Sequence, residues 1–282
     1  MRIKATAKIN WALNVLSRRP DGYHELDMLN QRLTLSDEIV LTPAKGITLS
    51  VIGSMDAPGD ERNLAWRAAA LMQGLCPSCP GVHISLDKRI PSGAGLGGGS
   101  ADAAAVMLGL NELWGMKMPL QALRDLGKAL GADVPYCLGG GFARVGGIGE
   151  RISPIPGARA FNLVLLQPEE SLSTKQVFEQ LPSSAPGRPA DIPGAIQSIR
   201  QYDPASLHLS ARNQLQQAAL ALCPTIGDAL HDLSTHRALF AQMSGAGSLV
   251  YGVFADANAA MQAAQKLQKK WGFCLFTQTI PS

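Results

Sequence analysis

Residues Pro91 to Ala101 read PSGAGLGGGSA and place five glycines between a predicted strand and a predicted helix. The strand is Val82 to Leu86, in which apolar and polar residues alternate. The helix is Ser100 to Trp114, which is rich in Ala and Leu and has Ser100 as its expected cap. Because glycine has no Cβ, such a loop can bring several main-chain N–H groups against an anion, and the helix dipole adds to the attraction. The segment therefore predicts a phosphate-binding loop.

Two better-known glycine loops fit this segment less well. Gly93 to Gly98 satisfies the G-x-G-x-x-G pattern of dinucleotide folds, and Glu112 follows about twenty residues later. In that fold the glycines follow the strand directly and the acid ends a second strand, whereas here Asp87 to Pro91 intervenes and Glu112 lies within the helix. A Walker A loop needs a Gly-Lys-Ser or Gly-Lys-Thr ending, which the run lacks. A flexible linker rarely opens directly into a capped apolar helix.

Composition predicts a soluble globular protein, whose mild positive charge would suit an anionic small molecule. The 282 residues are 46% hydrophobic, enough for one large domain or two ordinary ones. A net charge of +3 is too mild to imply nucleic acid as the main partner. Aromatic residues make up 5% of the chain, which also argues against a base-stacking surface.

The cysteines and the apolar runs indicate a cytoplasmic protein without a membrane segment. Five cysteines, an odd number in a chain with no secretory leader, indicate a reducing compartment. Cys76 and Cys79 form a C-x-x-C pair with His83 nearby, but a zinc site would need a fourth ligand. We therefore expect ordinary reduced thiols. No apolar stretch approaches the length of a membrane span.

The chain mixes strands and helices without strict βαβ alternation, which predicts an α+β fold. Apolar residues at every second position from Ile3 to Val15 predict a long first strand, and Arg19 to Gly22 suits a tight turn before the chain resumes at Tyr23. Further strands are expected at Ile39–Thr42, Ile47–Val51, Phe161–Leu166 and Phe273–Thr277. Helices are expected from a cap at Asn63 through Leu75, from a cap at Ser173, and at Leu120–Leu130, Ile192–Tyr202, Ala211–Leu222, Thr225–Leu233 and Asn258–Trp271.

Glycine and proline mark the turns and a domain boundary. Gly146-Gly147 lies between two strand-like segments and predicts a two-residue hairpin turn. Ser153 to Gly157 contains two prolines and a glycine, and we expect it to separate an N-terminal domain, 1–156, from a C-terminal domain, 157–282. Pro182 to Gly194 is rich in Pro, Ser and Gly and is expected to be an exposed loop.

The glycine loop also carries a family resemblance. Residues Pro91 to Ala101 match the pattern P-x-x-x-G-L-G-x-x-x-A of the superfamily of galactokinase, homoserine kinase, mevalonate kinase and phosphomevalonate kinase. That superfamily has an N-terminal strand bearing a lysine and a second glycine loop near the C-terminus, which resemble Lys8 and the run Met243 to Ser248.

Four motifs resemble one branch of these kinases, whose members phosphorylate a hydroxyl of a cytidine-diphosphate-linked methylerythritol in non-mevalonate isoprenoid precursor biosynthesis. They occur in the branch's order and span nearly the whole chain: Ala7-Lys8-Ile9-Asn10, Arg18 to His24, Gly97-Gly98-Gly99 before Ser100, and Gly131 to Pro135. The resemblance implies a two-domain kinase with a ribosomal-protein-like N-terminal domain, a ferredoxin-like C-terminal domain and an active site in the cleft between them.

The resemblance also implies roles for single residues. Lys8 and Asp133 match catalytic positions, while Asn10, Tyr23, His24, Thr174 and Phe178 match positions that bind the cytidine-linked substrate. ATP is the implied donor, with Mg²⁺ beside it, although relatives have a serine pair where this chain has Gly98-Gly99, so the metal ligands stay unknown. The implied ATP contacts are Asn63 and Lys88 with the loop Pro91, Ser92, Gly93, Ala94, Gly95, Leu96, Gly97, Gly98, Gly99, Ser100 and Ala101.

Phosphoryl transfer requires mainly alignment of a hydroxyl with the γ-phosphate and stabilisation of the transferring charge. Lys8 and Asn10 lie two apart on a strand and so project from one face. Asp133 can accept the hydroxyl proton as a general base while Lys8 polarises the alcohol. From residue type alone, a strand lysine is more often solvated, and an Asp before Val-Pro is more often a helix cap.

Three other functions remain open from the sequence. A kinase of the same superfamily acting on homoserine or a mevalonate-like alcohol shares the glycine loop but gives no reason for Asp21 to His24. A nucleic-acid-binding module would be consistent with the basic character of the chain, and a nicotinamide-dependent oxidoreductase with the G-x-G-x-x-G match. The sequence does not determine an oligomeric state.

Overall fold

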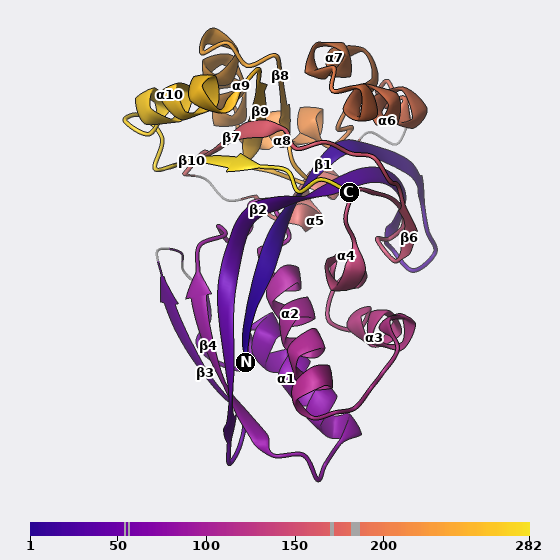
Figure 1. The fold of residues 1–282 in the computed structure, drawn as a ribbon. Coiled ribbons are helices and arrows are strands. Elements are labelled where there is room, and N and C mark those ends of the chain that lie inside the picture. Colours follow the sequence, from indigo (N-terminus) through magenta and orange to yellow (C-terminus); the bar gives the residue numbers. More distant parts are fainter. Residues whose placement is uncertain (54, 56, 170–171, 182–186) are drawn as a thin grey trace.

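The computed structural model describes residues 1–53, 55, 57–169, 172–181 and 187–282. It contains two β-sheets, each covered by helices, and Figure 1 shows them one above the other. The expected mixture of strands and helices is present. The predicted loop Pro182 to Gly194 lies partly outside the described residues.

The first sheet has the order β3-β4-β2-β5-β6, with β1 paired to β2. The β3–β4 pair is parallel, and the other pairs are antiparallel. Its strands are β1 (Arg2–Arg18), β2 (His24–Ala44), β3 (Thr48–Gly53), β4 (Gly81–Lys88), β5 (Ala143–Gly147) and β6 (Arg151–Pro154). The predicted first strand and the turn at Arg19 to Gly22 are therefore confirmed.

Two predictions for this sheet are wrong. The segment Ile39–Thr42 is not a separate strand, because β2 runs without interruption from His24 and stays paired to β1 through three register shifts that allow a long strand to bend. Gly146 and Gly147 are not the hairpin turn but the end of β5. The turn lies at residues 148–150, where the Glu150 carboxylate accepts the Ile148 N–H at 2.7 Å and holds a longer connection.

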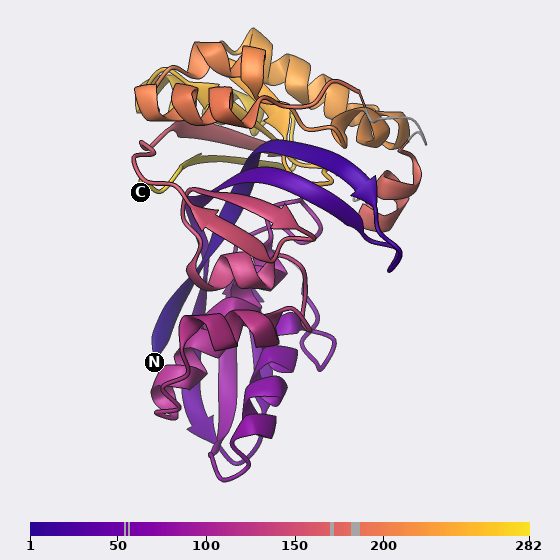
Figure 2. The same cartoon turned by 90° about the vertical axis from the view of Figure 1, so that its right-hand side faces the viewer.

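Helices α1 to α4 cover one face of this sheet (Figures 1 and 2). Asn63 caps α1, as predicted, by accepting the Ala65 N–H at 2.9 Å. The predicted cap of the next helix is wrong: α2 begins at Gly98, because Gly97 adopts a left-handed φ of 69° and turns the chain into the helix before Ser100 is reached. The helices are α1 (Leu64–Leu75), α2 (Gly98–Leu113), α3 (Leu120–Gly127) and α4 (Val134–Gly139).

The second sheet is antiparallel with the order β10-β7-β9-β8. Its strands are β7 (Asn162–Gln167), β8 (Phe240–Met243), β9 (Val250–Phe254) and β10 (Phe273–Gln278). The helices of this half are α5 (Thr174–Glu179), α6 (Ile192–Gln201), α7 (Leu207–Ser210), α8 (Gln216–Leu222), α9 (Thr225–Thr235) and α10 (Ala257–Leu267), with a 3-10 turn at Pro204–Ser206.

The predicted helix Ala211–Leu222 is wrong in its first half, because residues 211–215 are held by the first sheet instead. The Arg212 carbonyl accepts the Leu13 N–H at 2.9 Å, and the Asn213 side chain accepts the Leu215 N–H at 3.0 Å before α8 starts. These bonds satisfy main-chain groups that a helix would otherwise pair internally.

The β1–β2 hairpin joins the two halves of the molecule. Its two strands belong to the first sheet throughout and bend beneath the second sheet, and its tip lies near α5, where His24 stacks on Phe178 (Figure 2). Trp11 of β1 is fully buried there and makes edge contacts with Phe161 and Tyr251, at ring-centroid distances of 5.3 and 5.6 Å. Since β6 ends at Pro154, the chain crosses to the second half close to the predicted boundary at residues 156 and 157, and the boundary itself stays a prediction.

The expectation of reduced thiols is wrong for Cys76 and Cys79, which form a disulfide. Cys76 ends α1, and the turn that follows brings the two Cα atoms within 5.4 Å, a normal separation for such a bridge. Cys137, Cys223 and Cys274 are free cysteines. Among the described residues, none of the helices has both the length and the apolar character needed to cross a membrane.

The Trp11 contacts predict a large loss of stability on truncation. We expect Trp11→Ala to lower the free energy of unfolding by about 3–5 kcal/mol, because it opens a cavity between the sheets. Leu16→Ala, on the same strand but at a position 59% exposed, should change it by less than about 0.5 kcal/mol. Urea titration of both variants measures the difference, and equal effects would show that Trp11 does not join the halves.

Candidate active site

Lys8 and Asp133 form an ion pair at the centre of the molecule. The Lys8 Nζ lies 3.6 Å from the Asp133 Oδ2, and the Lys8 residue is only 4% exposed. The lysine is thus not on a solvated face. Asp133 immediately precedes α4, yet within the described part of the chain its carboxylate makes no capping hydrogen bond, so it is directed toward Lys8 and not toward the helix.

Asn10 holds the Lys8 ammonium from the same face of β1. Its Oδ1 accepts a hydrogen bond from Lys8 Nζ at 2.8 Å. Its Nδ2 donates to the Asn30 Oδ1 on β2 at 2.7 Å, which fixes the orientation of the Asn10 amide. The structure therefore brings Lys8, Asn10 and Asp133 together as predicted and adds Asn30, a buried residue that the sequence analysis missed.

The first glycine loop passes directly over this pair. Gly93, Gly95 and Gly97 all have positive φ, between 67° and 77°. A Cβ on Gly97 would lie 3.3 Å from Lys8 Cε and 3.6 Å from Asp133 Oδ2. The Lys8 N–H also donates to the Leu96 carbonyl at 3.0 Å. The loop and the N-terminus of the 16-residue helix α2 thus face the same space as the ion pair.

The second glycine loop supports the first. The Ser244 hydroxyl donates to the Gly95 carbonyl at 3.0 Å and accepts the Asn10 N–H at 3.4 Å. A Cβ on Gly95 would lie only 2.1 Å from the Ser244 main-chain oxygen, so the two loops touch backbone to backbone. Ser244 thereby links β1, the first loop and the second half of the molecule.

A cavity of about 1290 Å³ opens between the two halves next to these groups. Its inner end is lined by Lys8, Asn10, Gly95, Ser100 and Asp133. Its outer end is lined by four of the predicted substrate residues, Tyr23, His24, Thr174 and Phe178. This volume exceeds that of an ordinary ligand pocket and is large enough for two ligands side by side.

Two of the outer residues form an aromatic stack across the halves. The His24 and Phe178 rings lie 4.8 Å apart, centroid to centroid, with an interplanar angle of 19°. Burial and the nearby Arg18 guanidinium lower the pKa of His24, so its ring is neutral near pH 7. A neutral imidazole can both accept and donate a hydrogen bond, which suits it to the edge of a polar heterocycle.

Asn63 and Lys88 do not line this cavity. The Asn63 amide is used as the α1 cap and as a donor to the Pro58 carbonyl at 2.7 Å. The Lys88 ammonium is buried between the carboxylates of Asp37 and Asp102. Neither side chain as placed presents a free group to a ligand, because each is already hydrogen-bonded within the fold.

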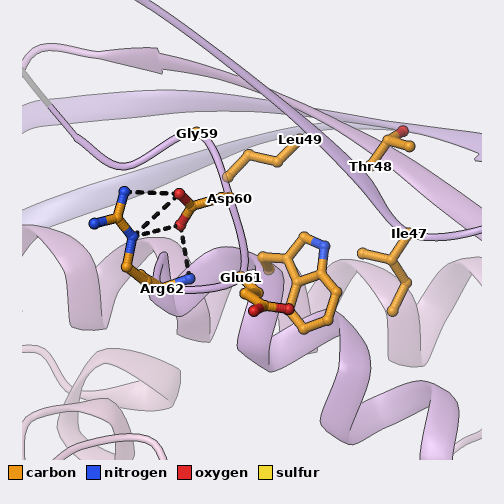
Figure 3. Close-up of a pocket in the computed structure, with 8 residues that line it drawn as sticks. Ile47, Thr48, Leu49, Gly59, Asp60, Glu61 and Arg62 are labelled. Carbon is orange, nitrogen blue, oxygen red and sulfur yellow. Dashed lines mark hydrogen bonds and ion pairs between the residues drawn. The ribbon is translucent and has the colours of Figure 1, made fainter.

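A smaller cavity of about 470 Å³ lies beside β3 and the start of α1 (Figure 3). In it, the Arg62 guanidinium forms an ion pair with the Asp60 carboxylate at a distance of 2.7 Å. None of the residues predicted for the site lines it. The residues predicted for the site that line a cavity line the larger one. Across the described residues, no group of three or more His, Cys, Asp or Glu side chains is arranged to hold a metal ion.

Comparison with known proteins identifies relatives over the whole chain. The family model described as "GHMP kinases N terminal domain" matches residues 63–141, and the one described as "GHMP kinases C terminal" matches residues 196–272. A protein from Geobacter sulfurreducens named 4-diphosphocytidyl-2-C-methyl-D-erythritol kinase is 39% identical over 282 residues, 99% of both chains. A protein of the same name from Lachnospira eligens is 37% identical over 273 residues, 96% of this chain and 94% of its own.

Solved structures agree with these matches. A crystal structure of 4-(cytidine 5'-diphospho)-2C-methyl-D-erythritol kinase superposes with a TM-score of 0.85 at 32% identity, covering 100% of both chains. The homoserine kinase from Cytophaga hutchinsonii superposes with a TM-score of 0.70 at 21% identity, covering 99% of this chain and 95% of that one. The similarity to the homoserine kinase, at 21% identity, concerns the fold alone.

The contact between the two glycine loops predicts different effects at two glycines. Gly93 and Gly95 both have positive φ, but a Cβ on Gly93 would meet nothing within 4 Å, whereas one on Gly95 would strike the Ser244 oxygen. We expect Gly93→Ala to cost about 1 kcal/mol of stability from its backbone conformation and Gly95→Ala at least about 2 kcal/mol more. Thermal unfolding compares them, and similar melting temperatures would contradict the close contact.

Proposed function

The chain belongs to the GHMP kinase family and is a kinase, and from this premise we propose that it transfers a phosphoryl group from ATP to the 2-hydroxyl of 4-diphosphocytidyl-2-C-methyl-D-erythritol. The family resemblance and the fold class predicted from the sequence are confirmed. The observation that carries the proposal is the Lys8–Asp133 pair beneath the glycine loop, in a cavity that continues to the His24–Phe178 stack. An oxidoreductase is set aside, because the family is one of kinases.

The inner end of the cavity is the proposed site of the ATP phosphates. Gly95 and Ser100 of loop 91–101 line this end, and we propose that main-chain N–H groups of the loop bind the phosphates. The dipole of α2 favours negative charge at the N-terminus of that helix. In this proposal the side-chain polar groups of Asn63 and Lys88 do not contact ATP, because they are engaged within the fold.

Magnesium is the proposed companion of ATP. Ser100 lines the cavity beside Asp133 and offers a hydroxyl oxygen, the kind of ligand that Mg²⁺ takes together with phosphate oxygens and water. When bound, the ion would neutralise charge on the transferring phosphates. We assign no further protein ligand to it.

Asp133 is the proposed general base and Lys8 the proposed electrophilic partner. The carboxylate is about one-third exposed and faces the cavity, so an alcohol can reach it. The Lys8 ammonium is fixed between Asn10 and Asp133 and cannot swing away without losing both contacts. This preorganisation places a positive charge where negative charge develops on the transferring group.

The outer end is the proposed site of the cytidine group. His24, Phe178 and the half-exposed Tyr23 provide aromatic surfaces, and stacking holds a base without covalent chemistry. Thr174, at the start of α5, and Asn10 are proposed to bind the rest of the substrate. Homoserine and mevalonate carry no aromatic base and would leave this end unused.

The substrate proposal is tested by comparing alcohols. Assays that couple ADP formation to a spectroscopic signal should give a kcat/KM for the cytidine-linked alcohol at least about a hundredfold above that for homoserine or mevalonate, because only the former gains stacking energy. Comparable efficiency with homoserine would refute the assignment.

The catalytic proposal is tested at Asp133. We expect Asp133→Asn to lower kcat by about 10²–10⁴-fold, because the amide cannot accept the proton, while ATP still binds and the protein stays folded. Asp125→Asn removes a carboxylate from the exposed face of α3 and should leave kcat unchanged. A folded Asp133→Asn enzyme with kcat within threefold of the original would remove Asp133 from the mechanism.

The cytidine subsite is tested at Phe178. We expect Phe178→Ala to raise KM for the cytidine-linked alcohol by about tenfold, because a base–aromatic stack contributes about 1–3 kcal/mol. KM for ATP should stay within about twofold, because the residue lies at the opposite end of the cavity. Steady-state kinetics with each substrate varied in turn measure both, and a rise confined to ATP would contradict the placement.

A further inference from the structure

A buried cluster of three charged residues lies behind the phosphate loop, outside the cavity. Lys88 ends β4, Asp37 belongs to β2 and Asp102 belongs to α2, and all three are at most 2% exposed. The Lys88 ammonium contacts the Asp37 carboxylate and donates to Asp102 Oδ2 at 2.9 Å. One cation therefore ties together three elements of the N-terminal half.

One arm of the cluster fixes the start of the loop. The Asp37 Oδ1 accepts the main-chain N–H groups of Arg89 and Ile90 at 2.6 and 2.8 Å. These are the two residues between β4 and Pro91, where the strand has ended and its ladder no longer supplies partners. Asp37 thus replaces the missing strand acceptor and sets the direction in which the chain enters the loop.

The other arm fixes the end of the loop. Asp102 lies at the start of α2, and through Lys88 it attaches this helix to β4. A Cβ on Gly98, the first residue of α2, would lie 3.0 Å from Lys88 Nζ and 2.9 Å from Ile90 Cγ2. The Lys88 ammonium therefore lies against the first residue of α2, and it can come this close because Gly98 has no side chain.

We propose that Asp37, Lys88 and Asp102 are positioning residues that set the separation between the two ends of the phosphate loop and thereby the affinity of the enzyme for ATP. The inference rests on the proposed function, in which the loop binds the ATP phosphates. All three side chains are buried, so their ionic hydrogen bonds are strong and the loss of one partner is costly.

The charges of the cluster do not balance, so we infer that hydrogen bonds, and not charge neutralisation, position the two ends of the loop. Two carboxylates face one ammonium, and burial raises the pKa of Asp102 while Lys88 opposes the shift. Among the described residues the second oxygen of Asp102, Oδ1, has no hydrogen-bond partner. A neutral side chain with one acceptor oxygen at position 102 can therefore still accept the hydrogen bond from Lys88.

The test compares two substitutions of Asp102 in the full-length enzyme. Asp102→Asn keeps an oxygen for Lys88, and we expect the Kd for ATP, measured by titration calorimetry, to stay within about twofold. Asp102→Leu removes the acceptor, and we expect the Kd for ATP to rise about tenfold or more while KM for the cytidine-linked alcohol stays within about twofold. Asp87→Asn, which breaks only the exposed pair with Arg89, is the matched control and should leave both constants unchanged.

A second variant keeps the test decisive if Asp102→Leu fails to fold. The double variant Lys88→Met with Asp102→Leu removes one charge of each sign and fills the space with apolar groups, while the Asp37 carboxylate keeps the main-chain N–H groups of Arg89 and Ile90 as donors. It still lacks the tie between the loop ends, so we expect the same rise in Kd for ATP.

The outcomes separate this inference from the function on which it rests. If the unaltered enzyme neither binds ATP nor phosphorylates the cytidine-linked alcohol, the proposed function fails. If it does both, a folded Asp102→Leu or double variant with unchanged ATP affinity overturns the positioning role. Equal rises in the Kd for ATP and the KM for the cytidine-linked alcohol would indicate general loosening and also overturn it, as would an Asp102→Asn enzyme that binds ATP as weakly as Asp102→Leu.

Discussion

The two glycine loops meet backbone to backbone at Gly95 and Ser244, and the arrangement of the site depends on that contact. The Ser244 hydroxyl holds the Gly95 carbonyl on one side and the Asn10 N–H on the other, although residues 95 and 244 lie 149 positions apart in the chain. The Leu96 carbonyl next to Gly95 accepts the Lys8 N–H. The first glycine loop is therefore shaped as much by the second half of the molecule and by β1 as by its own glycines.

Local patterns in the sequence predicted the parts of the site that depend on short-range geometry. Lys8 and Asn10 share a face because a strand has a period of two, and the loop before α2 was identified from its glycines. The start of α2 was misplaced because serine is a common helix cap, whereas in the structure Gly97, which lies against Lys8, precedes a helix that begins at Gly98. The α+β fold class followed from the order of the predicted elements. The continuity of β2 depends on β-bulges, which the residue types do not predict.

The residues that sequence analysis missed act through partners distant in the chain. In the sequence Asn30 is an ordinary polar residue of a strand, and only the structure shows that its side-chain oxygen orients the Asn10 amide. Asp37 and Asp102 are ordinary acids until β2, β4 and α2 enclose Lys88 between them. The same enclosure explains why Lys88, which family resemblance placed at ATP, has its ammonium turned into the protein. A lysine's burial and its partners are tertiary properties, and the type of residue gives no signal of them.

Strand β1 also connects Lys8 and Asn10 to the buried core that joins the two sheets. Asn10 faces the cavity, and its neighbour Trp11 points the opposite way into Phe161 and Tyr251. A rotation of one half against the other would have to break the Trp11 contacts with Phe161 and Tyr251, and it would also carry Asn10 away from Ser244. Movement on substrate binding is therefore expected at the hairpin tip, where Tyr23 is more than half exposed and the His24–Phe178 stack spans the halves. Asn10 at the inner end of the cavity is held in place, because the buried Trp11 is its neighbour on β1.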